Sequence, residues 1–410
     1  MIGEANIARP STRRTDRWVA AFGVLALLCG GLFALSLTYS RAAASRSQSA
    51  ERSIRAALDR QGAALLRGDR TAWLSTVEEP LSGDWARLYA NLRGLQVSGW
   101  LPRTRGVAGG PVWDAEVQIR VCFAAPTCTR TPETYVPLGD VISARTKWTV
   151  SGDRAVLTGF EQSTTDGPVP WKSETLTFAT GTRVVVAAPQ HLPGAEPARW
   201  LPAAERAAQV ADRYALTDPK PGRYLVFLAG AREWNTAVGT DREAAAFVDR
   251  TSESTAFAVV DATGLGADFA DEILLRHELG HIATLLGTLD NGDEWAVEGM
   301  AEYIAYAGRP VKSYELILDA RWHVEHTGWR GRLDLEWSTD PSERFGFYAM
   351  GFLAMRCIAQ EYGEPRLLRF FTEVVRRGES PEEASRSALG VPWDAVERAC
   401  RPIIAGWVNR

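Results

Sequence analysis

The most informative stretch of the chain is His277-Glu278-Leu279-Gly280-His281, which lies inside a long helical pattern. That pattern begins at Asp268, a residue type that caps helices, and ends before Gly287. Side chains four residues apart share one helical face, so both imidazoles can bind one metal ion with Glu278 beside them. The chain of 410 residues has only five histidines, so this spacing is informative. The sequence predicts a metal site here. The alternative is an amphipathic helix that happens to carry two histidines.

A second helical segment supplies acidic residues at a matching spacing. It reads Trp295-Ala296-Val297-Glu298-Gly299-Met300-Ala301-Glu302-Tyr303. Glu294, Glu298 and Glu302 follow one another in steps of four and therefore share one face. Such a face is usually a solvated acidic stripe, but the apolar residues around it leave little of this helix suited to water. Glu298 is therefore the candidate for a third ligand.

Together the two segments resemble those of the gluzincins, zinc metallopeptidases with two motif histidines and a downstream glutamate. They look closest to the compact peptidase families related to the M1 aminopeptidases. The resemblance covers residues 183–410 and implies a zincin-like domain with a small sheet and a mostly helical C-terminal half. It implies one Zn²⁺ per chain, with these ligands: His277, His281 and Glu298. It also implies that Glu302 orients a motif histidine, His277. Glu294 is the substitute ligand if the register differs.

The same resemblance implies hydrolysis of peptide bonds. Zinc with three protein ligands keeps one position for water, and Glu278 would act as the general base. The developing oxyanion needs a further donor, which the resembling families often supply as a tyrosine from a later helix. The segment Phe347-Tyr348-Ala349-Met350-Gly351 matches, so Tyr348 is the candidate, with a plain core aromatic as the alternative. His323 and His326 are rivals for this role.

The substrate implied is a peptide or protein, and the strand 257–262 is expected to form the sheet edge along which it lies. Main-chain hydrogen bonds at that edge would not select particular side chains of the substrate, so they do not indicate which peptide sequence is preferred. No motif for a free peptide N-terminus is present, so aminopeptidase activity is not carried over. Thr284 stands where a metzincin would have its glycine, which excludes that variant. The sequence contains no phosphate-binding loop, serine nucleophile elbow or nucleotide fingerprint.

Two other functions compete with the peptidase. One is a catalytically degenerate peptidase fold used as an envelope binding or scaffold protein. The intact set of three ligands and a base argues against it. The other is an iron site with two histidines and one carboxylate, which would gain nothing from the base at Glu278.

Residues 51–180 read as a separate α+β domain. A helix ending Ala64-Leu65-Leu66-Arg67-Gly68-Asp69 is followed by Trp73 and then by strands at 112–123, 141–150, 155–161 and 173–178. This arrangement resembles the cone-shaped domains related to nuclear transport factor 2 (NTF2-like), which often serve as accessory modules. We see no acid–base pair in it, and its simplest role is a spacer. The fold class expected for the whole chain is α+β.

An uncharged run from Trp18 to Ser40 predicts a transmembrane anchor. Its 23 residues span roughly 34 Å as a helix, enough for a hydrocarbon core of ~30 Å. A cleaved signal peptide is the alternative, because three alanines follow at 42–44. We expect a tail at 1–17, the anchor at 18–40, a linker at 41–50 and both domains outside the cytoplasm. The chain would then be a single-pass protein of the cell membrane.

Charge and cysteines add two expectations. The formal net charge is −4, which gives no electrostatic case for nucleic acid as a partner. Four cysteines lie outside the predicted anchor, and locality favours Cys122 with Cys128 and Cys357 with Cys400. Four buried thiols are the alternative.

Overall fold

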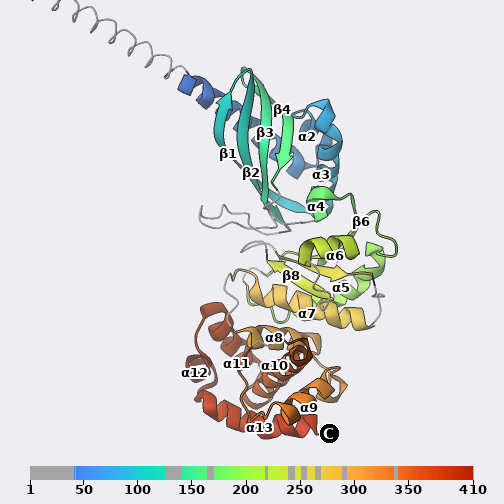
Figure 1. The fold of residues 1–410 in the computed structure, drawn as a ribbon, viewed down its shortest axis with the longest axis vertical. Coiled ribbons are helices and arrows are strands. Elements are labelled where there is room, and N and C mark those ends of the chain that lie inside the picture. The colour runs from blue at the N-terminus through green and yellow to red at the C-terminus, as the bar shows by residue number, and fades with distance from the viewer. Residues whose placement is uncertain are drawn as a thin grey trace, which may run out of the picture.

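The computed structural model describes residues 41, 43–124, 141–163, 170–217, 220–238, 245–250, 256–263, 269–288, 293–336 and 340–409. Within these residues the chain forms two sheets followed by a helical C-terminal region. Figure 1 shows them in succession along the long axis, with the four-stranded sheet at one end and helices α8 to α13 at the other. The mixed architecture agrees with the α+β class expected from the sequence.

The first unit packs helices against one face of an antiparallel sheet. The helices are 43–67, α2 (Arg70–Leu74) and α3 (Ser82–Gly94), with a 3₁₀ turn at Glu79–Leu81. The strands are β1 (Val97–Gly109), β2 (Val112–Phe123), β3 (Val141–Ser151) and β4 (Arg154–Gln162), hydrogen-bonded in that order. Strand β2 alternates from Asp114 to Ile119, with Ala115, Val117 and Ile119 buried and their neighbours exposed. That period of two is the pattern of a sheet with one solvated face.

The second sheet has five strands and is buried on both faces. Its order is β5 (Leu176–Thr180), β6 (Val184–Pro189), β7 (Tyr224–Ala229), β9 (Ala256–Asp261) and β8 (Ala246–Arg250). Strands β6, β7 and β9 are parallel, and the two edge strands run antiparallel to their neighbours. The central strands are continuous apolar runs, as expected where helices or other layers cover both faces.

Different elements cover the two faces of this sheet. Helices α5 (Pro197–Ala211) and α7 (Phe269–Leu285) pack on the face that includes Val184, Val226 and Ala258. The opposite face, with Val185, Phe227 and Phe257, belongs to the same hydrophobic core as the helices and strands of the first unit. The first unit is therefore packed on the second sheet through a shared hydrophobic core.

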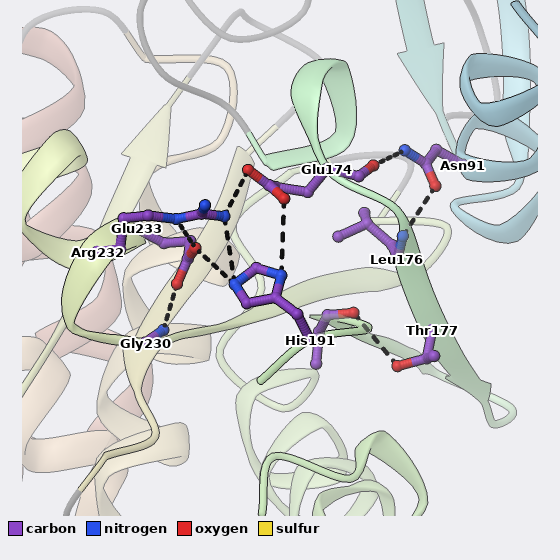
Figure 2. A network of polar contacts seen from close by, with 9 residues as sticks. Asn91, Glu174, Leu176, Thr177, His191, Gly230, Arg232 and Glu233 are labelled. Atoms are coloured by element: carbon purple, nitrogen blue, oxygen red, sulfur yellow. Dashed lines mark hydrogen bonds and ion pairs between the residues drawn. The ribbon is translucent and has the colours of Figure 1, made fainter. Parts of the chain in front are cut away.

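A polar network reinforces this junction (Figure 2). Asn91 of α3 donates to the carbonyl oxygens of Trp171 and Glu174 at 2.9 and 2.6 Å, next to the short helix α4 (Pro170–Ser173). The Glu174 carboxylate accepts from Arg232 of α6 (Ala231–Val238) at 2.7 Å. The Glu233 side chain is almost fully buried, and its Oε1 atom lies 3.3 Å from Nε2 of His191. These contacts join α3 to α6.

The C-terminal half of residues 183–410 is mostly helical, as the sequence predicts. It comprises α8 (Glu294–Ala305), a 3₁₀ turn (Val311–Ser313), α9 (Ile317–His326), α10 (Pro341–Tyr362), α11 (Glu364–Phe371), a π-helical turn (Thr372–Arg376), α12 (Pro381–Ala384), a second π-helical turn (Ser385–Leu389) and α13 (Trp393–Val408). A disulfide between Cys357 and Cys400 joins α10 to α13, which confirms that pairing. Cys122 is also disulfide-bonded, and its predicted partner, Cys128, lies outside the described residues.

Three expectations about elements need correction. Strand β9 is not the edge of its sheet, because β8 pairs with it on the outer side. The sequence predicts strand β5 as part of the first domain, but it pairs with β6 in the second sheet. The expected linker at 41–50 is helical where it is described and continues into the helix that ends at residue 67.

The expected localisation also needs correction. In the described part of the chain, no helix combines the length and the apolar character needed to cross a membrane. The predicted anchor, 18–40, lies outside the described residues. A single-pass membrane protein with its domains outside the cytoplasm is therefore not supported, and we do not retain that placement.

Candidate metal centre

Helix α7 carries the two motif histidines on one face. His277 and His281 are one helical turn apart, and their Nε2 atoms approach to 3.1 Å. Their rings lie nearly perpendicular, with centroids 4.7 Å apart. The opposite side of the helix packs on the second sheet through Leu275, Leu279 and Ile282. Burial of that apolar side turns both imidazoles toward the helical half.

Helix α8 brings a carboxylate to these two imidazoles. Oε2 of Glu298 lies 3.3 Å from Nε2 of His277 and 3.4 Å from Nε2 of His281. Two nitrogen atoms and one oxygen atom, each from a residue type that binds metals, therefore form a compact triangle. The three side chains are mostly buried, with exposed fractions of 14 %, 10 % and 16 %.

The triangle has the dimensions of a zinc site. Zinc–nitrogen and zinc–oxygen bonds of about 2.0–2.1 Å at tetrahedral angles hold ligand atoms roughly 3.3–3.4 Å apart. The observed separations are 3.1, 3.3 and 3.4 Å. Burial raises the pKa of Glu298, but the two histidines outweigh it, and the net pKa lies far below its usual value. The carboxylate is therefore an anionic donor, and the residues present fit a zinc ion.

Glu302, one turn further along α8, supports the first histidine. Its Oε1 atom lies 3.1 Å from Nδ1 of His277. Burial lowers the pKa of His277, but the hydrogen bonds with Glu298 and Glu302 raise it well above its usual value. A proton on Nδ1 shared with Glu302 leaves Nε2 as the atom available to a metal, the usual arrangement for a ligand histidine.

Glu278 lies between the two histidines in sequence and is itself buried. Burial raises the pKa of this carboxyl group, and the nearby histidines only partly oppose the effect. A carboxylate held away from water binds a proton more readily than one that is hydrated. That property suits a group that must accept a proton during a reaction.

Tyr348 of α10 stands beside the triangle. Its ring centroid lies 6.4 Å from that of His277, with the two rings nearly perpendicular. Burial, followed by the negative charge of Glu298, raises the pKa of its phenol well above the usual value. The hydroxyl therefore stays protonated and can act as a hydrogen-bond donor.

The other sequence candidates lie elsewhere. Glu294 is exposed in the first turn of α8 and does not belong to the ligand triangle. His323 of α9 packs against Gly346, whose β-carbon, if present, would lie 3.2 Å from that of His323. Residues 346 and 348 are about 200° apart around a helix, so His323 contacts the side of α10 opposite Tyr348. His326 is exposed and stacks on Trp322.

Two features near the centre could not be predicted from the sequence. One is edge strand β8, a short segment whose pairing with β9 reveals it. The other is Tyr314, a buried tyrosine whose pKa is raised well above its usual value by burial and then by the charge of Glu302. Neither has a local sequence signal, because both depend on contacts between distant segments.

Comparisons with known proteins give only a distant likeness. No model of a known protein family matches the chain, and no curated protein matches it. Among solved structures it is similar to an M1 zinc metallopeptidase from Deinococcus radiodurans, with 15% identity and a TM-score of 0.38 over 77% of this chain and 94% of that chain. It is also similar to yeast LTA4 hydrolase, with 12% identity and a TM-score of 0.40 over 74% of this chain and 46% of that chain. Values this low do not assign a family or an activity.

Proposed function

We propose that the protein is a zinc-dependent peptidase. The observation that carries this proposal is the triangle formed by His277, His281 and Glu298, with separations of 3.1 to 3.4 Å that match tetrahedral zinc. The base expected beside such ligands, Glu278, is present and buried. The solved structures named above include an M1 zinc metallopeptidase, but their likeness is too distant to carry this proposal.

Each residue of the site has a separate role in the proposed hydrolysis. A zinc ion held by the three ligands would polarise the scissile carbonyl and activate a water molecule. Glu278 accepts the proton of the attacking water and then donates it to the leaving amine, which its raised pKa favours. The Tyr348 hydroxyl donates a hydrogen bond to the oxygen that becomes negative. Glu302 holds His277 in the required tautomer.

Strand β8 is the candidate for the substrate-binding edge. It is the outer strand on the side of β9, and it runs antiparallel to β9. An edge strand offers main-chain donors and acceptors that can pair with an extended peptide. This assignment replaces β9, which is paired on both sides.

The first unit is a candidate NTF2-like accessory module, as its sequence predicts. Because its core is continuous with one face of the second sheet, we infer that it supports the peptidase half directly.

The test of this function separates metal binding from proton transfer. Glu278→Gln keeps the size of the side chain and leaves the three ligands intact, so zinc measured by mass spectrometry should stay near one per chain. Hydrolysis of a mixed peptide library should fall by ~10²–10⁴-fold, because the general base is lost. The matched control is Glu325→Gln, the same change at an exposed glutamate on α9, which should leave both quantities unchanged.

Two outcomes would decide against the peptidase. Equal hydrolysis by Glu278→Gln and wild type would remove Glu278 from the mechanism. A wild-type protein that binds zinc but cuts none of the peptides would indicate a metal-binding scaffold.

A further inference from the structure

Helices α8 and α10 touch backbone to backbone at one pair of glycines. A β-carbon on Gly299 would lie 2.6 Å from the carbonyl oxygen of Gly351 and 3.0 Å from its α-carbon. A β-carbon on Gly351 would lie 2.9 Å from the carbonyl oxygen of Trp295 and 3.1 Å from the α-carbon of Gly299. All these neighbours are backbone atoms, which cannot rotate away as a side chain can. Only glycine fits on either side of this crossing.

The contact between α7 and α8 is different. There a β-carbon on Gly280 would meet the side chain of Ile304, at 3.3 Å or more. A side chain can shift by a few tenths of an ångström, so that contact tolerates adjustment. The spacing of packed helices depends on the residues at their contact. The α8–α10 spacing is therefore the more rigid of the two, since no side chain separates the helices at the crossing.

The crossing lies next to the groups that the mechanism uses. Gly299 directly follows the ligand Glu298 on α8. Gly351 follows Tyr348 by three residues on α10, which puts both on one face of that helix, one turn apart. The backbone contact therefore sets how far the Tyr348 phenol stands from the carboxylate of Glu298. Glycine is unfavourable inside a helix compared with alanine, so its presence at both positions costs helix stability that the close contact offsets.

We propose that Gly351, seated on Gly299, is a positioning residue that fixes the Tyr348 hydroxyl at the distance from the metal centre where it can donate to the oxyanion. This inference rests on the proposed peptidase function and extends it from the reacting groups to the helix crossing that places them. It concerns residues that touch neither substrate nor metal, so their effect must pass through Tyr348.

Gly351→Ala should therefore lower kcat by moving Tyr348. The added methyl group must push α10 away from α8 or turn it, and a displacement of about 1 Å near a reaction centre can cost ~10²-fold in rate. Removing one oxyanion donor costs ~10²–10³-fold, so Tyr348→Phe sets the upper limit of the effect. We expect Gly351→Ala to reduce kcat about 10- to 100-fold within that limit. KM and zinc content should stay close to those of the wild type.

A double-mutant cycle distinguishes positioning from general damage. In the Tyr348→Phe background, Gly351→Ala should reduce kcat by less than about threefold, because the group that it misplaces is already gone. A merely structural defect would reduce kcat equally in both backgrounds, and that result would overturn the proposal. Gly406→Ala on α13 is the matched control, since a β-carbon there would meet no atom within 4 Å.

A second measurement does not depend on activity. With 3-fluorotyrosine incorporated and Co²⁺ bound, the fluorine signal of Tyr348 can be assigned by its absence in Tyr348→Phe. Its paramagnetic shift falls steeply with distance from the metal. The shift should become clearly smaller in Gly351→Ala and stay unchanged in Gly406→Ala. An unchanged shift in Gly351→Ala would overturn the proposal even if its activity were reduced.

Two further outcomes keep the test decisive. If Gly351→Ala does not fold, Phe352→Leu replaces it. Phe352 is the next residue on α10, and its ring packs on that of Tyr314 with the centroids 4.1 Å apart, so trimming it loosens the packing of α10 beside the crossing. Its loss of kcat should likewise vanish in the Tyr348→Phe background, and an equal loss in both backgrounds would overturn the proposal. If the wild type hydrolyses no peptide, the proposed peptidase function is wrong, and this inference is overturned with it. If the wild type is active but the losses of kcat caused by Gly351→Ala and Tyr348→Phe are additive, only the positioning role of Gly351 is refuted.

Discussion

Helices α7 and α9 each carry two of the five histidines, at spacings that bring both side chains to one helical face. On α7, His277 and His281 converge with a carboxylate from the neighbouring helix. On α9, His326 is exposed and stacks on Trp322, whereas His323 is partly buried against Gly346. The α9 pair does not belong to any group of metal-binding side chains within the described residues.

The difference between the pairs lies in what faces them. Spacing alone puts two imidazoles on one side of a helix, but a third ligand must come from another element. Helix α8 supplies Glu298 to the α7 pair, and Glu302 fixes the tautomer of its first member. A histidine pair on a helix is therefore evidence for a metal only when the packing of the neighbouring helix presents a carboxylate to it.

The largest effect should come from removing that carboxylate. Glu298→Ala leaves two imidazoles, too few for a tight zinc site, so zinc affinity should fall by more than ~100-fold and hydrolysis should fall with it. Zinc retained after dialysis, measured by mass spectrometry, checks this. The matched control is Glu294→Ala, one turn earlier on the same helix and exposed, which should keep full zinc. Full zinc in Glu298→Ala would mean that another carboxylate, Glu302 first, is the ligand.

A smaller effect should follow from loosening His277. Glu302→Ala removes the acceptor 3.1 Å from Nδ1 of His277, and the loss of such a partner typically lowers metal affinity by ~10–100-fold. Glu302→Gln keeps an oxygen that can accept from Nδ1–H, so its zinc affinity should lie between those of Glu302→Ala and the wild type. Competition against a chelator of known affinity measures all three. Equal affinities for Glu302→Ala and the wild type would show that α7 alone holds the imidazole in place.

Much of this arrangement could be predicted from the sequence because it depends on local periodicity. The i,i+4 spacing of the motif histidines and the steps of four on α8 predict facing side chains without knowledge of the fold. The segment 112–123 is predicted as a strand with the same bounds as β2, because its composition is rich in residues that favour strands. The disulfide between α10 and α13 is the pairing of Cys357 with Cys400 that locality favours.

The features that could not be predicted depend on contacts between distant segments. Strand β8 is five residues long and ends in Asp249-Arg250, so its pairing with β9, not its composition, makes it a strand. Strand β5 has a β-rich sequence, but nothing local indicates which sheet it joins. The close contact between Gly299 and Gly351 likewise cannot be predicted from the sequence, because it forms only when α8 packs against α10.

The smallest effects should come from the α9 pair, which completes the comparison. His323→Ala and His326→Ala should each leave zinc content at the wild-type level, since neither side chain contributes to the ligand triangle. His326→Ala removes only an exposed stack on Trp322, so the free energy of unfolding should change by less than about 0.5 kcal/mol. His323→Ala should leave kcat and KM unchanged, because His323 contacts the side of α10 that faces away from Tyr348. Metal analysis, urea unfolding and peptide kinetics on both variants check these expectations. A loss of kcat in His323→Ala with full zinc would restore His323 as a rival to Tyr348, because α10 would then have to present the opposite face to the substrate.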